Sequence, residues 1–96
     1  MTILLSPKGT FPATIIEIID HYCVVMNRGK QNNIQVGRRV LVYEPTTEKI
    51  QGRWEYLEIV KGRGRVITVE ENKATIESDC LKTFENPKIG DLVKPI

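Results

Sequence analysis

Histidine occurs once in this sequence, as His21, and cysteine only twice, as Cys23 and Cys80. Any Ser-His-Asp relay would have to use His21, which lies beside Asp20 in a short turn where a solvated, non-catalytic role is typical. The two cysteines lie too far apart for a metal-ligand spacing, and Cys23 has the character of a small core residue. We therefore expect no enzymatic activity, no metal and no cofactor.

Long hydrophobic runs and a strong charge of one sign are also missing. No apolar run approaches the roughly 20 residues of a membrane span, and the first residues lack the basic segment of a secretion signal. We therefore expect a cytoplasmic protein with two reduced thiols. The net charge is +2, from 14 basic and 12 acidic side chains, which does not by itself indicate a nucleic-acid partner.

What the sequence does contain is a series of short β-branched segments separated by turn residues. We expect strands over 14–20, 22–26, 38–43, 54–60, 64–70, 73–78 and 91–94, an exposed loop over 45–52, and no helix. The length, 96 residues, suits one domain with a modest core. The sequence therefore predicts a single all-β domain over 1–96, with six or seven strands in a small, partly closed β-barrel of SH3-like or OB-like size.

The two halves of the chain resemble each other. Residues 66–78 align without gaps on 15–27, and 89–93 fall on 36–40. Each half reads as strand, tight turn, strand, polar loop, then a β-branched residue, Gly, two residues and Val. This order predicts an internal duplication, with pseudo-repeats at about 14–43 and 65–94.

The first repeat also carries a glycine-turn pattern, made of the segments Asn27-Arg28-Gly29, Asn33-Ile34-Gln35-Val36-Gly37 and Val40-Leu41-Val42-Tyr43. It resembles a signature of small bacterial β-domains, found for example in the C-terminal domain of flagellar assembly protein T. The resemblance covers about 14–43, with a weaker echo at 66–94. It implies a small β-barrel with Gly and Asn at turns of positive φ, and no catalytic residues. Because the flagellar protein does not consist of this domain alone, the resemblance does not imply a flagellar role.

Alternation assigns an inner and an outer face to the strands. In the second half the apolar positions are Ile67, Val69, Ala74 and Ile76. Through the gapless alignment, the matching core positions of the first half are Ile16, Ile18, Cys23 and Val25. The outer face of the first hairpin then holds five apolar side chains, Ile15, Ile19, Tyr22, Val24 and Met26.

An apolar face of that size calls for a cover. Residues 1–5, or Trp54 with Tyr56, could cover it within one chain, and a second copy of the chain could cover it from outside. Our leading hypothesis is a non-catalytic interaction module that forms homo-oligomers, as part of a bacterial or phage assembly.

The alternative hypothesis is a nucleic-acid-binding barrel. Alternating Lys61, Arg63 and Arg65 would share one face of a strand, and the full basic set is Arg38, Arg39, Arg53, Lys61, Arg63 and Arg65. Nearby tyrosines and Trp54 could stack on bases. Glutamates interspersed through the same region favour an ordinary solvated strand instead.

Overall fold

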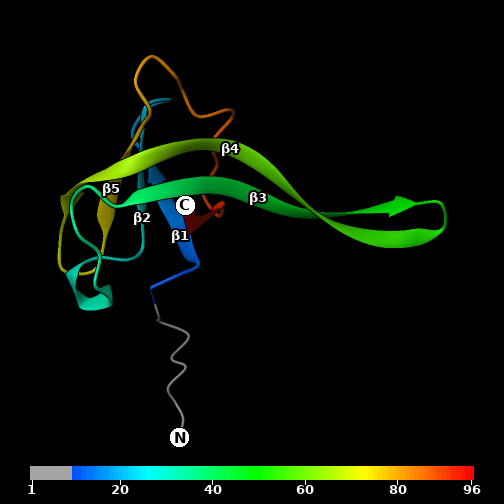
Figure 1. Ribbon diagram of the computed structural model, residues 1–96, viewed down its shortest axis with the longest axis horizontal. Helices are drawn as coiled ribbons and strands as arrows, with labels where there is room; N and C mark the ends of the chain where they lie inside the picture. Colours follow the sequence, from blue (N-terminus) through cyan, green and yellow to red (C-terminus); the bar gives the residue numbers. More distant parts are fainter. Residues whose placement is uncertain (1–9) are drawn as a thin grey trace, which may run out of the picture.

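The computed structural model describes residues 10–96, which form one antiparallel sheet of six strands. The elements are β1 (Ala13–Ile18), β2 (Cys23–Met26), the 3-10 turn η1 (Lys30–Asn32), β3 (Arg39–Ile50), β4 (Arg53–Val69), β5 (Ala74–Ser78) and β6 (Leu92–Pro95). The strand order is β1-β2-β5-β4-β3-β6, and β6 pairs with β1, so the sheet closes into a ring (Figure 1). The predicted all-β class is confirmed for this part of the chain, in which no helix is long and apolar enough to cross a membrane.

The ring encloses one apolar core. Its buried side chains are Ala13, Ile15, Val24, Met26, Ile34, Val40, Val42, Val66, Ala74, Ile76, Phe84 and Val93. Most are β-branched or small residues that suit the inner surface of a tightly curved sheet. Phe84 is the exception in size and comes from the connection between β5 and β6. It lies against Gly62, where an added Cβ would be 2.9 Å from the phenyl ring.

The two halves of the ring contact each other through equivalent hydrogen bonds. Gly37 N donates to Val66 O at 2.8 Å, and Gly90 N donates to Ile15 O at 2.9 Å. Both glycines have positive φ, 96° and 103°, a conformation that side chains disfavour. The glycine turn before β3 therefore binds the first strand of the second half, and the turn before β6 binds the first strand of the first half.

The predicted outer face of the first hairpin is wrong for three of its five residues. Ile15, Val24 and Met26 are 0% exposed in the core of the ring, so they cannot contact a partner. Ile19 and Tyr22 remain outside, each 53% exposed, in the turn between β1 and β2. Two local irregularities, which a strict alternation does not include, cause the error.

The first irregularity is a β-bulge in both halves. Ile16 is an extra residue in β1 between two paired positions, so Ile15 and Ile18 both face inward while Ile16 is 43% exposed. In β4, Ile67 is the extra residue after buried Val66 and is 36% exposed. Ile16 and Ile67, both expected in the core, therefore lie on the outside.

The second irregularity is the length of the turns. Ile18 pairs with Val24, which leaves five residues between them, whereas Val69 pairs with Ala74, which leaves four. The gapless alignment ignores this difference and is one residue out of register in the second strand. A shift of one residue exchanges the two faces of a strand. The alignment therefore placed Val24 on the outer face, although Val24 occupies the buried position that Ala74 occupies in the second half.

Other core predictions hold better. Ala74 and Ile76 are buried, and Ile18 and Val69 pack against the core. Val25 is a buried hydrophobic residue outside the main core cluster, and Cys23 is half-buried. Residues 1–5, considered above as an internal cover, lie outside the described residues.

The prediction of an exposed loop over 45–52 is also wrong. Residues up to Ile50 continue β3, and β4 runs without a break through the segment 61–63 that was expected to separate two strands. Only Gln51 and Gly52 form the turn, with φ of 52° and 82°, as the two-residue hairpin turn with positive φ at both positions requires. Pro45 is compatible with this strand because it lies where β3 has a neighbour on one side only.

Candidate interaction surface

A two-stranded arm, residues 44–60, projects from the ring. β3 pairs with β6 only as far as Tyr43, and β4 pairs with β5 only from Gly64 onward. Beyond these points β3 and β4 pair with each other alone and extend well past the rest of the molecule (Figure 1). Such a hairpin gains no support from neighbouring strands, so its side chains are exposed on both faces.

One face of the arm continues the outer surface of the ring. Cross-strand pairs on this outer face are Tyr43 with Val60, Pro45 with Glu58, Thr47 with Tyr56 and Lys49 with Trp54. Trp54 is 70% exposed and Tyr56 is 61% exposed. The opposite face also carries apolar side chains, with Ile50, Leu57 and Ile59 between 37% and 49% exposed.

A polar cluster holds Tyr56 in place near the base of the arm. The Tyr56 hydroxyl donates to Glu58 Oε2 at 3.1 Å, and Lys94 Nζ of β6 lies 2.6 Å from Glu58 Oε1. The same ammonium lies 4.9 Å from the centre of the Tyr43 ring. The hydrogen bond from Lys94 lowers the pKa of Glu58 and raises that of Lys94, while desolvation and the bond to Glu58 raise the pKa of Tyr56.

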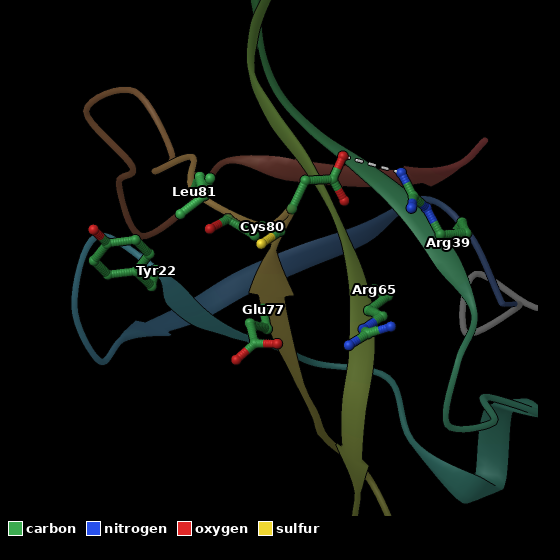
Figure 2. Close-up of a pocket in the computed structure, with 8 residues that line it drawn as sticks. Tyr22, Arg39, Arg65, Glu77, Cys80 and Leu81 are labelled. Carbon is green, nitrogen blue, oxygen red and sulfur yellow. Dashed lines mark hydrogen bonds and ion pairs between the residues drawn. The ribbon is translucent and has the colours of Figure 1, made fainter.

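At the ring end, the same outer face of β3 and β4 becomes basic. Arg39 lies opposite Arg65, and Leu41 lies opposite Arg63. Beside them is an open hollow of about 640 Å³. Figure 2 shows Tyr22 and Leu81 on one side of this hollow, Arg39 and Arg65 on the other, and Glu77 and Cys80 between them.

The charges around the hollow are only partly compensated. Arg39 Nη2 lies 3.1 Å from Asp79 Oδ2, and Glu77 lies opposite Arg65 on the neighbouring strand. Arg63 and Arg65 are exposed and form no ion pair with any residue from 10 to 96. The hollow thus offers the guanidinium group of Arg65 next to apolar side chains, and Arg63 lies two residues before Arg65 on the same face of β4.

The structure gathers only part of the basic set predicted from the sequence. Arg39, Arg63 and Arg65 share the ring end of the outer face. Arg53 lies at the far end of the arm, 3.6 Å from Glu55. Arg38 lies before β3, with its guanidinium 5.6 Å from the centre of the Phe11 ring.

Lys61 does not belong to that face. The ladder pairs Val42 with Gly62 and Tyr43 with Val60, so Lys61 bulges out of the alternation on which the prediction depended. Its side chain is 4% exposed and lies 3.2 Å from Glu44 and 3.6 Å from Asp91. It is therefore a buried structural cation rather than part of a basic surface.

Sequence reasoning missed the arm as a surface, although it named Trp54 and the nearby tyrosines as side chains that could stack on bases. The available signal was the segment 53–60, whose alternation could have been paired with the β-branched residues of 44–50. The residue of the cluster that sequence reasoning missed is Lys94, which only the pairing of β3 with β4 and β6 brings beside Tyr43 and Glu58.

Comparisons with other proteins add no assignment. No family model matches the chain, and a search of curated proteins finds no relative. The resemblance of residues 14–43 to bacterial β-domains therefore stays a prediction. Within residues 10–96, no three His, Cys, Asp or Glu side chains lie together as metal ligands would.

Proposed function

We propose that this protein is a non-catalytic interaction module that binds another protein through the outer face of β3 and β4. The observation that supports this most is the exposure of Trp54 and Tyr56 on the projecting arm, at 70% and 61%. Tryptophan and tyrosine are the residue types most enriched at the energetic centres of protein interfaces.

The energetics of the arm support the same proposal. A two-stranded hairpin is marginally stable in water unless a further surface covers it. Burying one aliphatic or aromatic side chain contributes about 1.5–3 kcal/mol, and the arm exposes several. The cluster of Tyr56, Glu58 and Lys94 orders one of these side chains before binding, which reduces the entropy lost on association.

The finer features of the hypothesis remain part of this proposal. We propose a small barrel built from two pseudo-repeats, which self-associates and acts within a larger bacterial or phage assembly in the cytoplasm. The contact surface differs from the one expected at first, because most of the first hairpin's apolar side chains fill the core.

A photo-reactive amino acid placed at Tyr56 tests the proposal in living cells. We expect light-dependent adducts to a protein when the group replaces Tyr56. None are expected when it replaces Glu71, which is exposed in the turn between β4 and β5 and serves as the matched control. Equal adduct yields at the two positions, or none at either, would refute binding through the arm.

Nucleic-acid binding is the second candidate. Arg39, Arg63 and Arg65 lie on the same outer face as Tyr56 and Trp54, and single-strand binders combine basic and stacking residues in this way. Fluorescence of Trp54, the only tryptophan, offers a direct readout. If this candidate is correct, short single strands quench that fluorescence and the effect weakens steeply with salt. An unchanged spectrum at low salt would remove it.

A further inference from the structure

The outer face of β3 and β4 has two chemically different ends. The arm end presents Trp54 and Tyr56, and the ring end presents Arg63 and Arg65 beside the hollow. Between them, Val60 is 52% exposed and lies directly opposite Tyr43, whose ring is buried and lies 4.9 Å from the ammonium of Lys94. An aromatic end, a middle that exposes Val60 and a basic end therefore follow one another along a single surface.

When two copies of this face lie antiparallel, the aromatic end of each copy lies against the basic end of the other. Guanidinium groups bind the faces of indole and phenol rings through cation–π interactions, most strongly when water is excluded. If two copies face each other around a twofold axis near Tyr43 and Val60, each aromatic end covers the other copy's basic end. A twofold contact of this kind uses the same patch on both subunits and closes without leaving a free site.

The distribution of charge favours the same direction. On this outer face the arm carries Lys49 and Glu58, whose charges balance, whereas the ring end carries the guanidinium groups of Arg39, Arg63 and Arg65. Two ring ends placed against each other therefore repel, and the antiparallel arrangement avoids that repulsion.

Resting on the proposed function, we infer that the partner of this surface is a second copy of the chain. The two copies pack the outer faces of β3 and β4 in antiparallel fashion, with Trp54 and Tyr56 of each against the hollow, Arg63 and Arg65 of the other. The hollow, about 640 Å³ and flanked by Tyr22 and Leu81, receives the indole of Trp54.

The size of this contact sets the expected affinity. Twelve residues of β3 extend about 40 Å, and two strands are about 10 Å wide, so the face offers about 400 Å² on each copy. Stable interfaces bury about 800 Å² on each partner. We therefore expect a reversible dimer with a dissociation constant in the micromolar range, visible only at high protein concentration.

Two variants that damage opposite ends of the face test the arrangement. The arm variant carries Trp54→Ser and Tyr56→Ser, and the ring variant carries Arg63→Glu and Arg65→Glu. Sedimentation equilibrium should show dimerisation at least tenfold weaker for each variant alone. Lys30→Glu with Lys88→Glu makes the same change in charge at exposed positions off this face and should dimerise like the wild type.

Mixing the two variants gives the decisive result. The arm variant keeps an intact ring end and the ring variant keeps an intact arm, so one of the two contacts can form between them. We expect a heterodimer weaker than the wild-type dimer and absent from either variant alone. If circular dichroism shows that the arm variant is unfolded, the single variant Trp54→Ala replaces it in the mixture.

The inference is overturned if the wild type stays monomeric at millimolar concentration, if the control pair weakens dimerisation as much as the ring variant, or if the mixture gives no heterodimer. The photo-reactive group at Tyr56 separates this outcome from failure of the proposed function. Adducts between two copies of the chain support the dimer. Adducts exclusively to other proteins support binding through the arm, and they remove self-association and the second copy as partner.

Discussion

Lys61 and Asp91 form an ion pair that is almost completely removed from solvent. Their charged atoms lie 3.6 Å apart, and the side chains are 4% and 3% exposed. The Lys61 ammonium also donates to the carbonyl of Asn86 at 2.7 Å and lies 3.2 Å from Glu44. Because Glu44 and Lys61 stand at the base of the arm, this cluster links the arm to the connection between β5 and β6.

Substitution of Lys61 by Met should therefore destabilise the fold strongly. It leaves the Asp91 carboxylate buried without its cation, a loss that costs about 3–5 kcal/mol in comparable pairs. Urea unfolding followed by circular dichroism measures the change. Arg53→Met, which breaks an exposed pair with Glu55, is the control and should cost less than about 1 kcal/mol. Equal losses for the two variants would show that the buried pair contributes nothing special.

The pair of Glu58 and Lys94 should make the base of the arm sensitive to pH. The hydrogen bond from Lys94 lowers the pKa of Glu58 in the folded state. Its contribution to stability is then present above the pKa of the unfolded chain and is lost as the pH falls through the lowered value. For Lys94, whose pKa is raised by the same bond, the contribution is present below the unfolded pKa and is lost as the pH rises through the raised value.

Carbon-13 NMR of the Glu58 carboxyl group measures this coupling directly. We expect the titration midpoint of Glu58 to lie below the ordinary glutamate value in the wild type and to rise in a Lys94→Met variant. Lys49→Met, on the same outer face of the arm, is the matched control and should leave the midpoint where it is. A midpoint that does not move on loss of Lys94 would show that the pair does not persist in solution.

Much of the ring could be predicted from the sequence because its turns contain residue types that favour turns. Gly37 and Gly90 mark equivalent turns, and both adopt the positive φ that their position suggested. The strand segments follow from β-branched runs, as at Ala74–Ser78. The side chains that face inward could not be predicted. A bulge at Ile16 and one extra residue in a turn shift the alternation of inward and outward side chains, and the amino-acid composition gives no sign of either.

The candidate surface was harder to predict for a related reason. The segment 44–52 contains Pro45, Gly52, two threonines and three charged residues, a composition that favours a turn or loop. It forms a strand because residues 53–59 pair with it across a two-residue turn, a tertiary feature that single-segment propensities do not contain. The same pairing leaves Lys61 as a bulge and removes it from the expected basic face.

The two free thiols should differ in reactivity. Cys80 is exposed beside the hollow, whereas Cys23 is half-buried. Burial and the negative charges of Asp20 and Glu77 raise the pKa of Cys23 and so lower its fraction of reactive thiolate. We expect iodoacetamide near neutral pH to label Cys80 first, as peptide mass spectrometry would record. Faster labelling of Cys23 would contradict the described burial.

The sharpest test of the strand faces lies in two neighbouring residues of the same type. Ile15 is 0% exposed in the core, and Ile16, the bulged residue beside it, is 43% exposed. Ile15→Ala should lower the free energy of unfolding by about 2–5 kcal/mol, because it removes buried methylene groups and leaves a cavity. Ile16→Ala should cost less than about 1 kcal/mol, as substitutions on the surface usually do.

Urea unfolding of the two variants decides between the bulged strand and the regular one. A regular alternation that places Ile16 in the core, as the sequence alone suggested, requires the opposite order of stabilities. If Ile15 were instead the contact with a second copy, Ile15→Ala would weaken dimerisation while leaving the unfolding of the monomer nearly unchanged. A large loss for Ile15→Ala, measured at a concentration where the protein is monomeric, therefore places this side chain in the core of a single chain and leaves the outer face of β3 and β4 as the surface for association.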